Sequence, residues 1–256
     1  MLPFFTRYVA LGDSMSIDLY PALDAGEIDV AVALERDTHA GRVAPLGAAS
    51  LLYQNDDARY PESQGEDLGA RYPGIRLQNL ALDGATIGDV FGEQLLALDD
   101  ESGPTLVTLT AGGNDLLSAM ANRPRASLLE SIAQEVMDAY DFLVASIRRD
   151  VPESVIVLTS IYDPSDGTGR IPGVLEGVGV LPLHILDAMN AHIRSLADDE
   201  SVLYADAHSQ FLGHGVSAPE ADRWYWRRSL VEPSAAGADA LRRLWLSVLD
   251  AADSAP

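Results

Sequence analysis

The sequence predicts an α/β fold in which a mainly parallel sheet of about five strands is covered by helices on both faces. Short apolar runs alternate along the chain with longer stretches of helical spacing, which is the element order of a doubly wound domain. The apolar runs are nearly continuous rather than alternating, as expected for strands that are buried on both faces. We therefore expect right-handed crossovers between parallel neighbours.

The element boundaries follow from the same pattern. The runs expected to form strands are 8–11, 75–80, 105–109, 155–159 and 202–205. Helical spacing predicts helices over 87–98, 127–149 and 183–197. A last helix is expected to follow Pro233, because proline is favourable in a first helical turn.

Two stretches are too long for simple crossovers. Residues 15–74 are rich in Asp, Gly and Ala and show only a possible short helix near 44–53, so we interpret them as an insertion that roofs the cleft. Residues 162–182 are rich in Gly and Pro and are expected to form a loop. No repeat or linker indicates a second domain, and residues 1–256 are predicted to form one.

Composition excludes several classes of function. The 17 basic and 39 acidic residues give a net charge of −22, and every basic residue is Arg, so nucleic acid and anionic lipid are not expected partners. The absence of Cys excludes disulfides and thiolate catalysis. No apolar run approaches the ~18 residues of a membrane span, and no signal peptide is evident. We expect a soluble, cytoplasmic protein.

Polar and glycine-rich turns follow the first three predicted strands. They are Gly12-Asp13-Ser14, residues 79–86 and residues 111–115. Each alone is an ordinary strand-to-helix turn, where these residue types serve the backbone. Because ligands collect at the carboxyl edge of a parallel sheet, three such turns at successive strand ends indicate a site there.

These turns resemble the sequence blocks of the SGNH or GDSL-type hydrolase family. LGDSMS at 11–16 is similar to the first block, LALDGATI at 80–87 to the second and TAGGNDLL at 110–117 to the third. The resemblance implies a flavodoxin-like three-layer α/β/α fold and hydrolysis of a small-molecule lipid or carbohydrate ester. It implies no metal or other cofactor.

The resemblance also assigns roles that make physical sense. Ser14 is the expected nucleophile, with its hydroxyl facing the cleft at the end of the first strand. Its own N–H, the N–H of Gly84 and the side-chain amide of Asn114 are expected to form an oxyanion hole. One such donor is worth about 3 kcal/mol of barrier.

The segment before the last helix departs from the family pattern. The resemblance predicts an Asp-x-x-His there, yet the chain has Ser229 and Glu232, although Pro233 and Gly237 are kept. A glutamate of ordinary pKa is weaker than imidazole as a base by about 3 kcal/mol in proton affinity, and burial in an apolar pocket reduces this deficit.

Three interpretations of this departure follow. Glu232 is itself the general base, or His214, on the loop between the fifth strand and the last helix, supplies it, with Glu232 available to hold the imidazolium. Alternatively, the site is degenerate and the protein binds an ester or glycan without turnover. The sequence leaves all three open.

Overall fold

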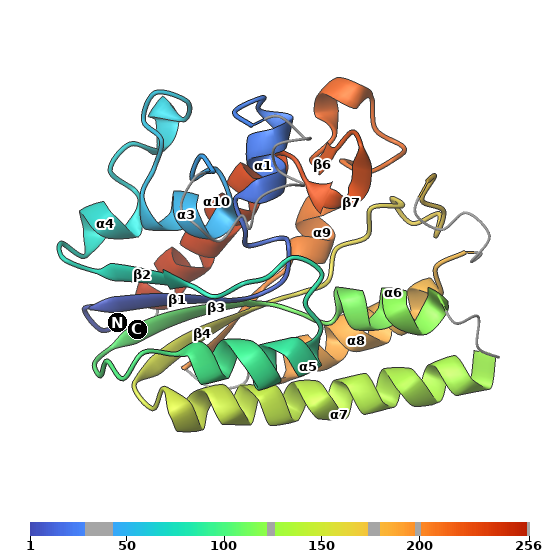
Figure 1. Cartoon of the computed structure of the whole chain (residues 1–256), viewed down its shortest axis with the longest axis horizontal. Helices are drawn as coiled ribbons and strands as arrows, with labels where there is room; N and C mark the ends of the chain where they lie inside the picture. The colour runs from blue at the N-terminus through green and yellow to red at the C-terminus, as the bar shows by residue number, and fades with distance from the viewer. Residues whose placement is uncertain (29–42, 122–125, 174–179, 198–200, 255–256) are drawn as a thin grey trace.

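The computed structural model describes residues 1–28, 43–121, 126–173, 180–197 and 201–254, and it contains the predicted α/β architecture. Its main sheet has the strand order β2-β1-β3-β4-β5, and every neighbouring pair is parallel (Figure 1). The strands are β1 (Arg7–Gly12), β2 (Arg76–Asn79), β3 (Thr105–Thr110), β4 (Ser154–Thr159) and β5 (Val202–Ala205). All five predicted strands are therefore confirmed.

Both faces of the sheet are buried, which explains the continuous apolar runs. Successive residues of β1 point to opposite sides: Tyr8 and Ala10 join one hydrophobic core, while Val9 and Leu11 join the other. Each core is closed by its own layer of helices, so the protein has three layers.

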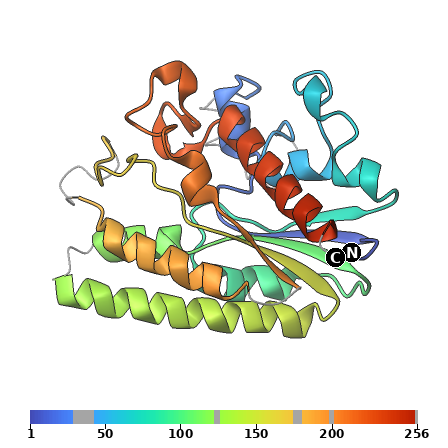
Figure 2. The same cartoon turned by 180° about the vertical axis from the view of Figure 1, so that it is seen from behind.

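The helices divide between these two layers (Figures 1 and 2). On one side lie α5 (Ile87–Asp89), α6 (Gly113–Ala121), α7 (Ala126–Asp150) and α8 (Leu183–Ser195). On the other lie α1 (Leu19–Asp24), α3 (Ala48–Tyr53), α4 (Leu68–Arg71), α9 (Ala207–Phe211) and α10 (Ala235–Asp253). Among the described residues, no helix combines the length and apolarity that a membrane crossing requires.

The predicted helix over 87–98 is wrong as a single element. After α5, the chain forms a π-helical turn over Val90–Gln94 and a 3₁₀ turn over Leu95–Ala97. The distortion occurs where Gln94 turns inward, only 2% exposed, and bonds the backbone of Gly12. Its Oε1 accepts from the Gly12 N–H at 2.8 Å, and its Nε2 donates to the Gly12 carbonyl at 2.8 Å.

The long segment 15–74 contains α1, α3, α4 and a 3₁₀ turn over Pro61–Ser63, while residues 29–42 lie outside the described part. The short helix predicted near 44–53 corresponds to α3. Between α9 and α10 the chain forms a two-stranded antiparallel sheet of β6 (Tyr225–Trp226) and β7 (Ser229–Pro233). Ser234 then caps α10 by accepting a hydrogen bond from the Gly237 N–H.

Gln94→Leu is expected to lower the free energy of unfolding by about 1–3 kcal/mol, because it leaves the buried N–H of Gly12 without its acceptor. Urea denaturation measures this change. Gln134→Leu, on the exposed face of α7, is the matched control and should shift stability by less than about 0.5 kcal/mol. Equal effects of the two substitutions would refute a special role for Gln94.

Candidate active site

Ser14 is delivered to the carboxyl edge of the sheet by a tight turn after β1. Gly12 has φ +119°, and a Cβ placed on it would lie 1.8 Å from the Thr110 carbonyl oxygen, so only glycine fits there. The Ser16 N–H then bonds the Asp13 carbonyl at 3.1 Å, which closes the turn. Ser14 lies in this turn and is 5% exposed.

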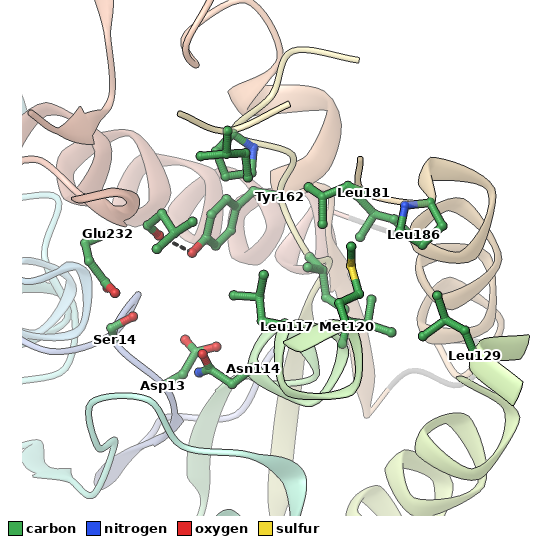
Figure 3. A pocket seen from close by; sticks show the side chains of 17 residues that line it. Asp13, Ser14, Asn114, Leu117, Met120, Leu129, Tyr162, Leu181, Leu186 and Glu232 are labelled. Carbon is green, nitrogen blue, oxygen red and sulfur yellow. Dashed lines mark hydrogen bonds between the residues drawn. The ribbon is translucent and has the colours of Figure 1, made fainter. Parts of the chain in front are cut away.

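Ser14 borders a pocket of about 60 Å³, several times the volume that one ordered water needs. Its polar end brings together Asp13, Ser14, Asn114 and Glu232, which come from three separate parts of the chain. Figure 3 shows the Ser14 hydroxyl and the Glu232 carboxyl pointing toward each other. The pocket thus collects three of the predicted site residues, Ser14, Asn114 and Glu232, at the edge where the sequence predicts a site.

Glu232 lies on β7, and the Tyr162 hydroxyl fixes this strand by donating to the carbonyl of Val231 (Figure 3). Burial raises the pKa of Glu232 from 4.5 to about 7, a hydrogen bond from the Ser14 side chain opposes this rise, and the charges of Asp83 and Asp13 add to it. The Oε2 atom of Glu232 is buried without a hydrogen-bond partner among the described residues. The carboxyl is therefore held in a state that favours taking up a proton.

Asp13 is a second buried carboxyl at the same end of the pocket. Burial raises its pKa to about 7, while hydrogen bonds from the Met15 N–H, at 3.1 Å, and from Thr110 oppose the rise. The bond to Met15 agrees with the turn-capping role that this residue type favours. Asp13 thus supports the turn that carries Ser14.

Asn114 lies in the first turn of α6, directly after β3. Its Nδ2 donates to the carbonyl of Ala85 at 3.0 Å, which orients the amide and leaves its second N–H available toward the pocket. Gly84 precedes Ala85 with φ +69° and is exposed, but it is not among the residues that line the pocket. The structure therefore brings Asn114, and not Gly84, into the pocket wall beside Ser14.

His214 lies in a different environment from the one that a general base requires. Its ring stacks on Trp224 with the centroids 3.6 Å apart and an interplanar angle of 4°, and its Nδ1 is 2.8 Å from the carbonyl oxygen of Asp222. Asp166 holds the loop by accepting the N–H groups of Gly213 and Gly215, each at 2.9 Å. His214 does not line the pocket.

The other histidines do not fill this role within the described chain. His184, His192 and His208 are also absent from the pocket lining, and His39 lies outside the described residues. Outside the turn that carries Ser14, Glu232 is thus the titratable pocket residue whose side chain points toward the Ser14 hydroxyl.

The sequence did not predict Tyr162, which lines the pocket, or Tyr20, which feels the charge of Glu232. Tyr20 of α1 donates to Asp83 at 2.9 Å, and burial together with the charge of Glu232 raises its pKa. The Tyr162 ring forms part of the pocket wall. The only sequence signal was their position: Tyr20 lies in the long segment after the first strand, and Tyr162 lies shortly after the fourth strand.

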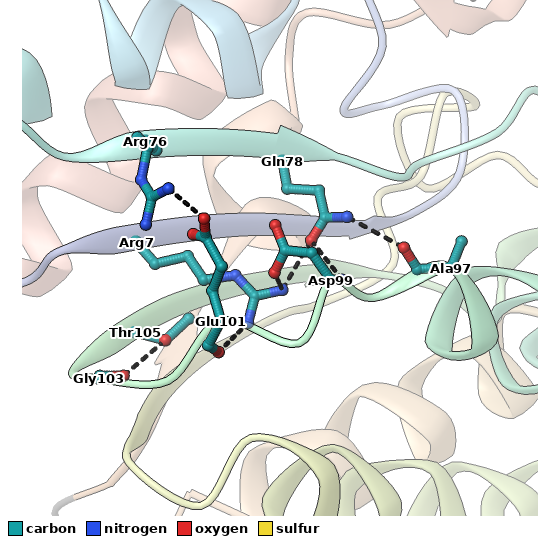
Figure 4. A network of polar contacts seen from close by, with 8 residues as sticks. All are labelled: Arg7, Arg76, Gln78, Ala97, Asp99, Glu101, Gly103 and Thr105. Carbon is teal, nitrogen blue, oxygen red and sulfur yellow. Dashed lines mark hydrogen bonds and ion pairs between the residues drawn. The ribbon is translucent and has the colours of Figure 1, made fainter.

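A second group of charged side chains lies at the opposite end of the sheet (Figure 4). The buried Arg7 guanidinium contacts Gln78 and Asp99, each at 2.6 Å, and the carbonyl of Glu101 at 3.1 Å. Arg76 pairs with the Glu101 carboxylate. These contacts fasten the chain before β3 to β1 and β2, so they serve the fold.

Comparison with known proteins supplies the family. The sequence model of the GDSL-like lipase/acylhydrolase family matches residues 38–240, which include Gly84, Asn114 and Glu232 and begin after Ser14. The chain belongs to this family. A search among curated proteins finds no match. The members of the family are ester hydrolases, and the fold described above is theirs.

Several solved structures share this fold. The chain is similar to an extracellular lipase from Streptomyces rimosus and to phospholipase A1 from Streptomyces albidoflavus, each with 22% identity, TM-score 0.58 and coverage of 96% of this chain and 99% of the other. It also resembles the acetylxylan esterase Axe2 from Geobacillus stearothermophilus, with 17% identity, TM-score 0.58 and coverage of 95% and 93%. Two of the matching Axe2 structures are catalytic mutants: in one an Asp is replaced by Ala, and in the other a His three residues later is replaced by Ala.

Glu232→Gln is expected to stabilise the protein at pH 8. The pKa of Glu232 in the folded state, about 7, lies above its ordinary value of 4.5. The free energy of unfolding of the wild type therefore falls as the pH rises from 4.5 to 7, because the folded state must then hold an ionised buried carboxylate. Glutamine removes this cost, about 1–3 kcal/mol at pH 8. Below pH 4.5 the difference between the two proteins should be at its smallest.

Chemical denaturation of both proteins across pH 4–8 measures this difference. Glu62→Gln, at an exposed position, is the matched control and should follow the wild type throughout. A Glu232→Gln protein that is less stable than wild type at pH 8 would contradict the assignment.

Proposed function

We propose that the chain is a serine ester hydrolase in which Ser14 is the nucleophile and Glu232 is the general base. The observation that carries this proposal is that the Ser14 hydroxyl points toward the buried carboxyl of Glu232, whose pKa is about 7, at the polar end of the pocket. A base of this pKa has the proton affinity of an imidazole, so the chemistry of a Ser-His pair is open to a Ser-Glu pair.

In the first half-reaction, the Ser14 Oγ attacks the ester carbonyl carbon while Glu232 takes the hydroxyl proton. The carbonyl π electrons move onto oxygen, and the resulting oxyanion accepts hydrogen bonds from the Ser14 N–H and the second N–H of Asn114. When the intermediate collapses, the ester C–O bond breaks and protonated Glu232 gives its proton to the departing alkoxide.

In the second half-reaction, the same groups act on water. Glu232, again ionised, takes a proton from a water molecule that attacks the acyl-enzyme carbonyl. Collapse of the second tetrahedral intermediate breaks the bond to Ser14, which recovers its proton from Glu232. The acid product leaves, and the site returns to its starting state without a cofactor.

The position of Glu232 supports its role. In Axe2 the catalytic Asp and His are three residues apart, which is the spacing of Ser229 and Glu232 here. We infer that Glu232 occupies the place of that histidine and that Ser229 occupies the place of the Asp. An imidazole needs a partner to fix its tautomer, whereas a carboxylate does not, so a serine at 229 is compatible with a glutamate at 232.

The rival function is binding without turnover. A pocket that retains Ser14 and Asn114 would still bind an ester if Glu232 failed to activate the hydroxyl. A fluorophosphonate probe separates the two functions, because it labels only an activated serine.

The wild type is expected to be labelled by a fluorophosphonate and to hydrolyse p-nitrophenyl esters, and Ser14→Ala should abolish both. Glu232→Gln should lower kcat/KM by about 10²–10⁴, the usual contribution of a general base. His214→Ala, the matched control, should retain wild-type rates, because His214 stacks on Trp224 away from the pocket. An unlabelled wild type supports the binding function, and loss of activity in His214→Ala alone would move the base to that residue.

The rate constant kcat/KM should fall about tenfold per pH unit below pH 7 and be constant above it, since the base acts only when ionised. Asp13 has a similarly raised pKa, so Asp13→Asn is measured beside the wild type. If Glu232 governs the profile, the ionisation near pH 7 persists in that variant. Its disappearance there would assign the titration to Asp13.

A further inference from the structure

The pocket that begins at Ser14 continues into a region lined by apolar side chains. Leu117 and Met120 of α6, Leu129 of α7, Leu186 of α8 and Leu181 before α8 form its far part (Figure 3). Met120 and Leu186 are buried, and the other three are half-buried. Among the described residues that line this part, none carries a side chain able to donate or accept a strong hydrogen bond.

Helix α6 sets the direction of this region. Asn114, Leu117 and Met120 recur every third residue and therefore lie along one side of the helix, from the oxyanion donor outward. Six residues of α-helix advance about 9 Å. An extended octanoyl chain has about this length, so chains of up to eight carbons fit along α6.

The position of Glu232 decides which half of an ester occupies the apolar region. The base must give its proton to the departing alcohol, so the alcohol lies on the Glu232 side of Ser14. In Figure 3, Glu232 and Ser14 lie at one end of the pocket and Leu129 at the other, with Leu117 and Met120 between them. The acyl half therefore points away from Glu232 and along α6.

We propose that this apolar region binds the acyl chain of the substrate. The protein would then hydrolyse esters with linear acyl chains of six to eight carbons in preference to acetyl esters. This proposal rests on the catalytic roles of Ser14 and Glu232 above. An acetyl group would fill only the space beside Asn114 and leave the wall formed by Leu117, Met120 and Leu129 unused. A sugar ring bound there would lose its hydrogen bonds to water, and the apolar side chains offer no hydrogen bonds in exchange.

The test is a series of p-nitrophenyl esters from acetate to decanoate. Each methylene that moves from water into the apolar region should raise kcat/KM about fourfold, so hexanoate should exceed acetate on the order of 100-fold. The rise should end near octanoate, where the chain passes Met120. A maximum at acetate, or a flat profile, would overturn the proposal.

Two substitutions test whether the acyl chain lies in this part of the pocket. Met120→Trp and Leu129→Trp add bulk to the far part and should lower kcat/KM for octanoate about tenfold or more while changing that for acetate little. Leu96→Trp, at a position that is 81% exposed and does not line the pocket, is the matched control and should keep the wild-type profile. Retained acetate hydrolysis shows that each variant is folded.

The outcomes also separate this proposal from the proposed function. A wild type that hydrolyses acetate fastest, with a profile that Met120→Trp and Leu129→Trp leave unchanged, refutes the acyl region and leaves Ser14 and Glu232 in place. A wild type that reacts with no ester and no fluorophosphonate refutes the catalytic function itself. An octanoate preference that both Trp variants abolish supports the acyl region.

Discussion

The close approach of β1 to β3 at Gly12 is the constraint on which the site depends. The strands pair residue by residue up to Gly12 and Thr110, and at this last pair a side chain on Gly12 would overlap the carbonyl of Thr110. Gln94 fastens the same glycine from the other side through both of its backbone groups. Because the turn to Ser14 starts here, a shift of Gly12 would also shift the Ser14 hydroxyl relative to Glu232.

A buried carboxylate replaces an imidazole only if its surroundings make it a comparable base. On the proposed mechanism, burial on β7 provides this, since it raises the pKa of Glu232 to about 7, and its Oε2 has no hydrogen-bond partner among the described residues. The same arrangement costs stability once the group ionises, because a negative charge must remain in an apolar site. On the proposed mechanism, the energy that destabilises the ionised resting enzyme is the driving force for taking the Ser14 proton.

The sequence predicted the parts of the structure that local patterns encode. The five strands follow from continuous apolar runs, and the turns that carry Ser14 and Asn114 follow from their places at strand ends. The π turn at Val90–Gln94 could not be predicted, because it arises from a bond between Gln94 and Gly12, 82 residues apart. Likewise, His214 had a suitable loop position in the sequence, but its stacking on Trp224 is a tertiary contact. The environment of Glu232 depends on Tyr20 and Tyr162, which no local pattern connects to it.

On the proposed function, a chain bound at one end of the pocket would change the solvation of the other end. The acyl region and the polar end share one cavity, so a chain that fills the space along α6 displaces water that would otherwise reach Ser14. A drier site strengthens the hydrogen bonds from Ser14 N–H and Asn114 to the oxyanion, and it raises the proton affinity of Glu232 further. If the proposed acyl site is correct, a bound acyl chain would contribute to the chemical step as well as to binding, and the preference for chain length would be expected in kcat as much as in KM.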